Sequence, residues 1–299
     1  MSAFTERALC FPCGDDELLG VAAVPDGPVG DVGVIVVVGG PQYRVGSHRQ
    51  FLLLSRYLAG AGFACLRFDF RGCGDASGES RGFESVDDDI RAAVDALLKA
   101  VPRVRQVVLW GLCDGAWAAG VYAPKDARVA GLVLLNPWLG EVGEDAGVVL
   151  KHYYLRRFLD RGFWRKVWRG RVSWHRSGGE LLGLCQRVFR RGDGVETGAS
   201  LSGQLRDAVL RSKRPVLWLL SGRDLVARRF ERVVEQDPVW SSLLRQGVVM
   251  HIEGADHTFS RAQWRDQVAA STLCWLHALQ DPPPPPAARV PTSDPATTP

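Results

Sequence analysis

The chain has 299 residues, of which 46% are hydrophobic, and its formal net charge is +4 at pH 7. This length suits one large α/β domain, and the composition is sufficient for a sizeable buried core. The sequence contains no run of roughly 18 apolar residues that would predict a transmembrane helix. Residues 1–9 lack the basic and apolar segments of a secretory signal. We therefore expect a cytoplasmic protein.

Seven cysteines, an odd number, are spread along the chain, and in the cytosol they would be reduced thiols. Cys10 and Cys13 have the C-x-x-C spacing of metal and redox sites, but no second cysteine or histidine pair completes a metal site. We interpret them as two small hydrophobic residues of an N-terminal strand. The sequence predicts no metal and no cofactor.

Strands and helices alternate along most of the chain. Apolar runs predict strands at 17–24, 32–38, 63–70, 106–112, 129–135, 215–220 and 248–253. Apolar residues at helical spacing predict helices at 47–59, 84–100, 114–123 and 260–279. Ser47 is the expected N-cap of the first helix. The alternation predicts an α/β fold whose mostly parallel sheet is covered by helices on both faces.

The alternation is interrupted between residues 140 and 213, where helical patches and glycine pairs occur without a convincing strand. We predict that residues 1–139 and 214–280 form the core and that 140–213 is an insertion into it. The tail 281–299 is rich in proline and lacks the apolar residues needed for packing, so we expect it to be disordered.

The segment Val107–Ala116 combines an apolar run with the pattern G-x-C-x-G, which has Cys113 at its centre. A strand that turns sharply into a helix lifts the side chain at the turn out of the sheet. Gly111 and Gly115 remove the side chains that would clash at such a turn. The pattern is similar to the nucleophile elbow G-x-S-x-G, with cysteine in the position of serine. We therefore predict that Cys113 is a nucleophile.

Such a nucleophile needs a base, and the base needs an acid that orients it. Asp224 follows the predicted strand 215–220, and His257 follows the predicted strand 248–253. Both lie just past the C-terminal end of a strand, at the edge where open α/β sheets hold their sites. The order nucleophile, acid, histidine is also the one expected for this elbow. We predict a Cys113–Asp224–His257 triad.

The chemistry of the predicted site follows from the thiol. The pKa of a cysteine is lowered at a helix N-terminus and beside a protonated histidine, so we expect Cys113 to attack as a thiolate and to form a thioester intermediate. The backbone N–H of Asp114 is one expected oxyanion donor. Pro41 has no N–H, so the second donor is expected from Gln42 or Tyr43, and the sequence does not choose between them.

Other polar residues compete for a role near this site. Asp256 neighbours His257, but adjacent side chains diverge, so we do not expect it to orient the histidine. His251 falls within a strand and is expected to be a packed core or edge residue. His48 follows the oxyanion loop, where it is either a helix-cap residue or a weak substrate contact.

Twelve basic residues lie between Lys151 and Arg191, opposed by two acidic residues and interleaved with tryptophans. Arginine suits phosphate groups, and a basic amphipathic helix with aromatic residues also suits a membrane surface. Three interpretations stay open: a solvated face, a site for an anionic or phosphate-bearing substrate that uses Arg165 and Arg169, and peripheral contact with a membrane. No recognised motif accompanies the charge, so we expect no nucleic-acid partner.

The turn 69–78 is similar to the D-x-R-G-x-G-x-S-x-G turn common among α/β-hydrolases, and we expect Asp69 and Arg71 to organise it rather than to react. The chain from about residue 5 to 280 thus resembles an α/β-hydrolase, which implies that the insertion 140–213 is a cap over the active site. More narrowly, residues 39–51 together with 111–116 resemble the exosortase A system-associated hydrolases, specifically the type-one hydrolase.

The narrower resemblance implies a bacterial cytoplasmic enzyme tied to exopolysaccharide production and exosortase-based sorting, without a defined substrate. A Cys-Asp-His triad on this fold is also similar to that of dienelactone hydrolase. We predict a cysteine-dependent hydrolase of an ester or thioester, and the basic insertion fits an acyl donor linked to CoA or to a carrier protein. The alternatives are transfer of the acyl group to a sugar hydroxyl and a non-catalytic scaffold. The oligomeric state is not predicted.

Overall fold

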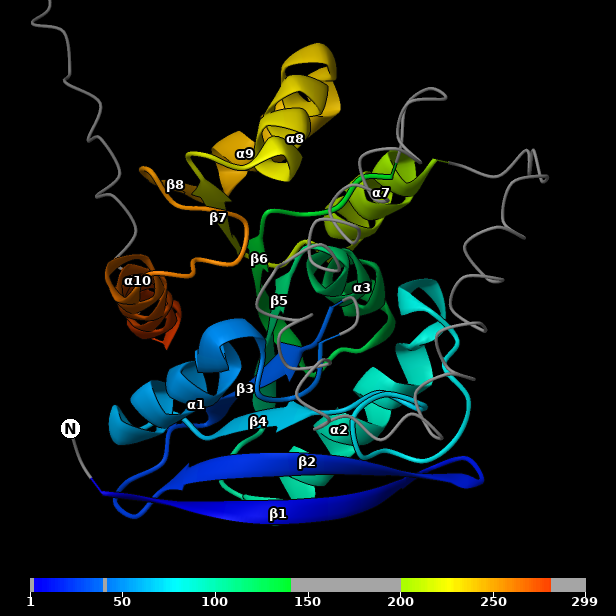
Figure 1. Cartoon of the computed structure of the whole chain (residues 1–299), viewed down its shortest axis with the longest axis vertical. Helices are drawn as coiled ribbons and strands as arrows, with labels where there is room; N and C mark the ends of the chain where they lie inside the picture. Colours follow the sequence, from blue (N-terminus) through cyan, green and yellow to red (C-terminus); the bar gives the residue numbers. More distant parts are fainter. Residues whose placement is uncertain (1–2, 40–41, 141–199, 281–299) are drawn as a thin grey trace, which may run out of the picture. The chain divides into compact units, whose positions relative to one another are not determined.

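The computed structural model describes residues 3–39, 42–140 and 200–280. The chain divides into two units, Met1–Trp138 with Leu205–Pro299 and Leu139–Gln204. The first unit holds an eight-stranded sheet in the order β1-β2-β4-β3-β5-β6-β7-β8 (Figure 1). The strands are β1 (Phe4–Cys13), β2 (Asp16–Pro25), β3 (Val32–Val37), β4 (Cys65–Phe68), β5 (Gln106–Leu112), β6 (Val129–Leu135), β7 (Val216–Ser221) and β8 (Val248–Ile252).

The sheet is parallel except at one end. β2 runs antiparallel to both β1 and β4, whereas every pair from β4 to β8 in the sheet order is parallel. β3 and β7 are buried along their whole length, which explains why their sequences are continuous apolar runs rather than alternating patterns. The prediction of an α/β fold with a mostly parallel sheet is therefore confirmed.

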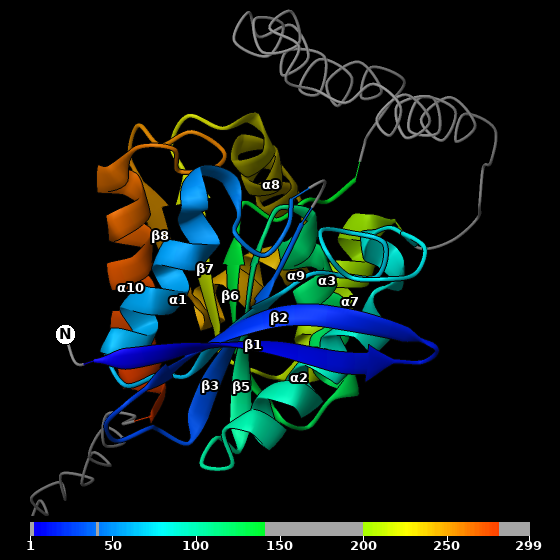
Figure 2. The same cartoon turned by 60° about the horizontal axis from the view of Figure 1, so that its bottom comes forward.

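Helices cover both faces of this sheet, with α1 and α10 together on one face and α2 and α3 on the other (Figures 1 and 2). α2 buries Ile90, Ala93, Val94 and Leu97, which recur at helical spacing. The helices α8 and α9 were not predicted, and α7 falls in the interval 140–213, for which only helical patches were expected. The helices are α1 (Gln50–Gly60), α2 (Asp87–Ala100), α3 (Asp114–Tyr122), α7 (Leu201–Ser212), α8 (Leu225–Gln236), α9 (Pro238–Gln246) and α10 (Ala262–Gln280).

The first helix begins later than the sequence predicted. α1 starts at Gln50, and the backbones of His48 and Arg49 have φ angles of 54° and 62°, in the left-handed region. The expected cap is wrong, because the Ser47 side chain has no hydrogen-bond partner in the described part of the chain. A left-handed conformation at a non-glycine residue carries a steric cost, so the segment before α1 is strained.

The interval 140–213, predicted as an insertion, lies mostly outside the described residues, and so does the tail 281–299. The described end of the interval includes α7, which buries Leu205, Ala208 and Val209. Leu205 contacts α3 at Gly120, where an added Cβ would overlap it. Among the described helices, none is both long enough and apolar enough to cross a membrane.

Candidate active site

Cys113 lies at the junction of β5 and α3, and its backbone is strained. Its φ and ψ angles are 61° and −120°, a conformation that non-glycine residues seldom adopt. The junction is tight, because a Cβ on Gly115 would lie 2.5 Å from the carbonyl oxygen of Val37 on the neighbouring strand β3. The strand–turn–helix geometry of a nucleophile elbow is therefore present, with the glycines where close approach requires them.

Asp224 and His257 follow β7 and β8, and their side chains meet. The Nδ1 atom of His257 lies 2.8 Å from Oδ2 of Asp224, and the carboxyl is only 8% exposed. The same Oδ2 atom accepts the backbone N–H of Ala227 at 3.1 Å, which makes Asp224 the N-cap of α8. An acid held in this way on Nδ1 fixes the tautomer in which Nε2 can accept a proton.

The surroundings of Cys113 favour the protonated thiol over the thiolate. Burial raises its pKa well above the ordinary value, and the carboxylates of Asp114 and Asp224 raise it further. A hydrogen bond from the backbone N–H of Asp114 lowers the pKa but does not offset these effects. The expectation of a lowered pKa is therefore wrong, because low hydration and two nearby negative charges outweigh the start of the helix.

A buried asparagine supports the histidine loop, and the sequence analysis did not identify it. Asn136, directly after β6, donates from Nδ2 to Oγ of Ser221 at 2.8 Å and to the carbonyl of His257 at 3.1 Å. Ser221 in turn donates its hydroxyl to the carbonyl of Asp256 at 3.0 Å. Asn136 has a φ angle of 41°. The available sequence signal for this role was a polar residue followed by proline, Asn136-Pro137, directly after an apolar strand.

The predicted oxyanion donors differ in their surroundings. The N–H of Asp114 is directed at the thiol, as the position after a nucleophile requires. The N–H of Gln42 makes a long contact of 3.4 Å with the carbonyl of Gly39, and its Oε1 accepts the N–H of Ser47. Tyr43 is 46% exposed. The choice between Gln42 and Tyr43 as second donor stays open.

Hydrogen bonds and an ion pair connect the loop that carries Gln42 and Tyr43 to the glycine-rich turn 69–78. Asp69 is fully buried and accepts the backbone N–H and the guanidinium of Arg44 and the N–H of Asp75. Arg71 forms a buried ion pair with Asp89 at 2.7 Å. Neither Asp69 nor Arg71 is left to react, so the prediction that they organise the turn is confirmed.

The remaining candidates have other environments. His251 is an exposed residue of the edge strand β8 and pairs with Glu231 at 2.8 Å. Asp256 binds Ser260 rather than orienting His257. His48 is exposed on the strained segment before α1. Arg165 and Arg169 lie outside the described residues.

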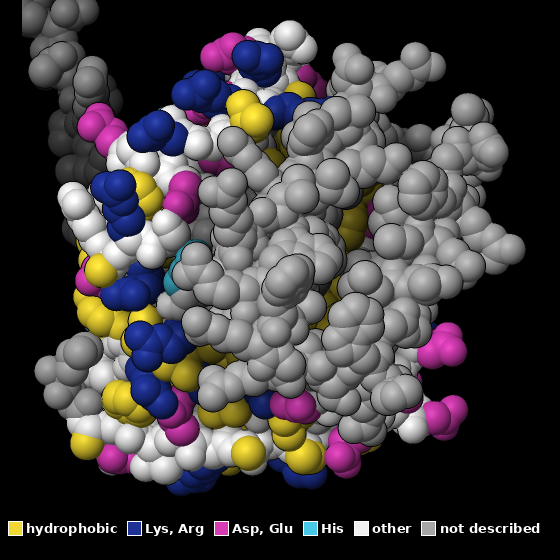
Figure 3. Space-filling model, in the orientation of Figure 1, with side chains coloured by type: hydrophobic (Ala, Val, Ile, Leu, Met, Phe, Trp, Pro, Cys, Tyr) yellow, Lys and Arg dark blue, Asp and Glu magenta, His cyan; other side chains and the backbone are white. Residues whose placement is uncertain are grey.

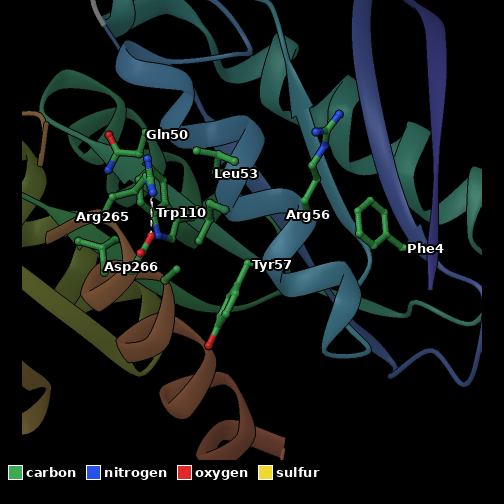
Figure 4. A pocket seen from close by; sticks show the side chains of 11 residues that line it. Phe4, Gln50, Leu53, Arg56, Tyr57, Trp110, Arg265 and Asp266 are labelled. Carbon is green, nitrogen blue, oxygen red and sulfur yellow. Dashed lines mark hydrogen bonds and ion pairs between the residues drawn. The ribbon is translucent and has the colours of Figure 1, made fainter. Parts of the chain in front are cut away.

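A cavity of about 340 Å³ lies between α1 and α10 (Figure 4). Its walls include Leu53 and Tyr57 of α1 and Trp110 of β5. Gln50 also lines it, although neither polar atom of this buried amide has a hydrogen-bond partner in the described part of the chain. No triad residue lines this cavity, so it is separate from the candidate active site. Within the described ranges no three His, Cys, Asp or Glu side chains are grouped as a metal site.

No curated protein matches the sequence significantly. Among solved structures, an esterase of Pyrococcus furiosus is 16% identical with a TM-score of 0.65, covering 92% of this chain and 91% of that chain. Dienelactone hydrolase of Anabaena variabilis is 16% identical with a TM-score of 0.57, covering 92% and 97%. Est1E of Butyrivibrio proteoclasticus, with ferulic acid bound, is 15% identical with a TM-score of 0.60, covering 92% and 100%.

At these identities the solved structures show the fold alone. The family model described as the alpha/beta hydrolase family matches residues 34–271, which is more than half of the chain. This range contains the elbow, Asp224 and His257. The prediction of a hydrolase is confirmed at the level of the family: this chain belongs to the alpha/beta hydrolase family.

Proposed function

We propose that the protein hydrolyses an ester or thioester through an acyl-enzyme intermediate on Cys113. The observation that carries this proposal is the strained elbow at Cys113 together with the 2.8 Å contact between Nδ1 of His257 and Asp224. A strained backbone at a non-glycine residue is characteristic of functional sites. The Asp224 carboxylate also affects the pKa of the thiol, so the acid and the nucleophile share one electrostatic environment.

The raised pKa decides how the nucleophile is activated. Because the free thiol stays protonated, His257 takes its proton as Sγ attacks the acyl carbon, as a histidine does for a serine. The alcohol or thiol of the substrate leaves with that proton, and a thioester to Cys113 remains. Water then attacks the thioester, His257 accepts a proton from the water, and the Cys113 thiol is restored as the acid departs.

Asp224 has two effects in this scheme. It holds Nδ1–H of His257, and it stabilises the imidazolium that forms when Nε2 accepts the thiol proton. The negative charge that disfavours an isolated thiolate therefore favours the thiolate–imidazolium pair that exists during attack. The N–H of Asp114 donates to the oxyanion of the tetrahedral intermediate.

The finer assignments rest on the sequence. The basic stretch with Arg165 and Arg169 supports a phosphate-bearing acyl donor, linked to CoA or to a carrier protein, and the predicted cap 140–213 would hold it. The resemblance of residues 39–51 supports a role in a bacterial exosortase and exopolysaccharide system. Transfer of the acyl group from Cys113 to a sugar hydroxyl would use the same intermediate with a different acceptor.

Replacement of the nucleophile tests the proposal. Cys113→Ala should abolish hydrolysis of p-nitrophenyl hexanoate and of hexanoyl-CoA while the thermal melting temperature stays within about 2 °C, because the change removes one sulfur atom from a half-buried side chain and keeps the Cβ. Cys113→Ser should fold but lose at least about a hundredfold in kcat, since a hydroxyl is a weaker nucleophile. Mass spectrometry of the wild type, quenched during turnover, should show the acyl adduct on the peptide that contains Cys113.

Two results would contradict the mechanism: full activity in Cys113→Ala, or an adduct on another residue. A wild type that turns over no ester or thioester, and forms no adduct, would favour the non-catalytic scaffold. Exposed Cys10 provides the control, because Cys10→Ala removes a thiol without touching the elbow and should leave hydrolysis unchanged.

A further inference from the structure

Three side chains on the segments that follow β6 and the triad acid are not used by the proposed chemistry. They are Trp138, which follows β6, and Leu225 and Arg229, which belong to α8. We call them the β6–α8 rim. They combine an aromatic ring, an exposed apolar side chain and a cation.

Trp138 is attached directly to the elbow. Its backbone N–H donates to the carbonyl oxygen of Cys113 at 3.2 Å. The N–H of Cys113 donates in turn to the carbonyl of Leu135 at 2.9 Å. The segment from Leu135 to Trp138 is therefore bonded to the elbow at both ends, and Trp138 is half-buried.

Arg229 lies over the indole of Trp138, with its Cζ atom 6.0 Å from the ring centre. Among the half-buried arginines of the described ranges, Arg229 alone has no hydrogen-bonded acceptor. The others each bind a carboxylate or a carbonyl: Arg44, Arg128, Arg206, Arg214 and Arg265. A partly dehydrated guanidinium without an anion is unfavourable, and its neighbour in space is an aromatic face rather than an acid.

Leu225 directly follows Asp224 and is 68% exposed. Leu225 and Arg229 are four positions apart on α8, so they lie on the same face of the helix, about 6 Å apart along its axis. Lys and Arg side chains gather over α8, with hydrophobic surface among them (Figure 3). The helix that begins at the triad acid thus presents an apolar position first and a cation one turn later.

We propose that the β6–α8 rim binds the part of the substrate remote from the scissile carbonyl, and that this part is a short apolar chain ending in an anion. Leu225 and Trp138 contact the chain, and Arg229 binds the terminal carboxylate or phosphate, both of which fit its planar donor fork. The proposal rests on the proposed function, and it places anion recognition on the hydrolase core as well as on the predicted cap.

The test compares p-nitrophenyl hexanoate with mono-p-nitrophenyl adipate, which has the same chain length and a terminal carboxylate. Wild type should prefer the adipate ester. Arg229→Ala should lower kcat/KM for the adipate ester by about tenfold more than for the hexanoate ester, through KM, since a remote charge contributes binding. Arg228→Ala is the matched control: this exposed neighbour carries the same charge and points about 100° around the helix, so its selectivity should equal that of wild type.

Arg229→Lys keeps the positive charge but removes the planar donor fork of arginine. This variant should therefore show only part of the wild-type preference for the adipate ester. Calorimetry on the Cys113→Ala variant measures binding to the subsite without turnover. Adipate and a phosphonate-terminated hexanoate should bind this variant more tightly than hexanoate does. Adding Arg229→Ala should remove the difference in affinity. The tighter of the two anions identifies the terminal group. Equal losses on both esters, or equal changes in Arg228→Ala, would overturn the inference. Absence of any Cys113-dependent hydrolysis would instead refute the proposed function, and calorimetry would still decide the subsite.

Discussion

Several described segments of this protein hold non-glycine residues at positive φ, and two of them, the elbow at Cys113 and the segment before α1, are stabilised in different ways. At the elbow, the backbone N–H and carbonyl of Cys113 are both hydrogen-bonded, and β3 lies against Gly115. In the loop 42–49 and the start of α1, His48 and Arg49 are exposed, and the Ser47 hydroxyl and Gln50 amide have no partners in the described chain.

The strain at the elbow is held by contacts to β3 and β6, whereas the strain at His48 and Arg49 lies on exposed residues next to two buried polar side chains without partners among the described residues. The elbow cannot relax without breaking contacts to β3 and β6. The segment 47–50 keeps hydrogen bonds from the Arg49 N–H to Gly46 and from the Ser47 N–H to Gln42, but it leaves the Ser47 hydroxyl and the Gln50 amide unpaired within the described ranges. We infer that the nucleophile is fixed before substrate binds, because its turn is held by contacts to strands on both sides.

The largest effect is expected from filling the elbow. Gly115→Ala would place a Cβ 2.5 Å from the carbonyl of Val37, which is too close to be accommodated without moving β3. We expect a loss of about 3 kcal/mol or more in the free energy of unfolding, measured by urea denaturation. Gly27→Ala, where no atom lies within 4 Å of the added Cβ, is the control and should change stability little. Equal stability of the two variants would show that the elbow is not packed as described.

The next effect concerns the pH dependence of Cys113. Because burial and two carboxylates raise its pKa, the thiolate fraction of the free enzyme is small at neutral pH and grows as pH rises. The rate of alkylation by iodoacetamide, followed on the Cys113 peptide by mass spectrometry, should increase about tenfold per pH unit from pH 7 to above 9. A rate that is already constant near pH 7 would contradict the raised pKa. The exposed Cys10 is read in the same digest as a reference.

A smaller effect, in the opposite direction, is expected at the start of α1. Gln50→Leu removes two buried polar atoms that lack partners and keeps a side chain of similar shape. The free energy of unfolding should increase by about 1–2 kcal/mol. Gln236→Leu, at an exposed position on α8, should give no such gain. Destabilisation by Gln50→Leu would mean that the amide is satisfied in solution.

The smallest effect tests the strain itself. Arg49→Gly removes the steric cost of a φ angle of 62° and adds freedom to the unfolded chain, so a net gain of about 0.5 kcal/mol is expected. Arg49→Ala removes the same side chain but keeps the Cβ, so it should not stabilise the protein. Equal melting temperatures for the two variants would show that the left-handed conformation carries no cost here.

The strands of the sheet were predicted correctly from the sequence, because strands buried on both faces consist of continuous apolar runs. It predicted Cys113, Asp224 and His257 because each follows a strand in the expected order, and the structure brings Asp224 and His257 into contact. It missed α8 and α9, since the stretch between Asp224 and the strand 248–253 mixes arginines with apolar residues and has an internal proline, Pro238, that begins the second helix.

Other features could not be predicted because they depend on contacts between distant segments. The pKa of Cys113 was expected to fall because of the helix start and the histidine, but burial by the folded chain raises it most, the adjacent Asp114 raises it next, and the distant Asp224 adds to the same direction. The strand-end position of Asn136 did not reveal its role, since that role lies in hydrogen bonds to Ser221 at the end of β7 and to the carbonyl of His257 after β8. The left-handed residues before α1 contradict the local preference for a Ser47 cap.

One carboxylate oxygen, Oδ2 of Asp224, accepts two hydrogen bonds. One comes from the backbone N–H of Ala227 in the first turn of α8, and the other comes from Nδ1–H of His257. The start of this helix and the orientation of the histidine ring therefore depend on the same atom. If the first turn of α8 frays on heating, the ring loses its anchor while the sheet is still intact. Thermal inactivation would then precede unfolding, and a residue added to strengthen the first turn of α8 would raise the temperature of inactivation without raising the melting temperature of the sheet.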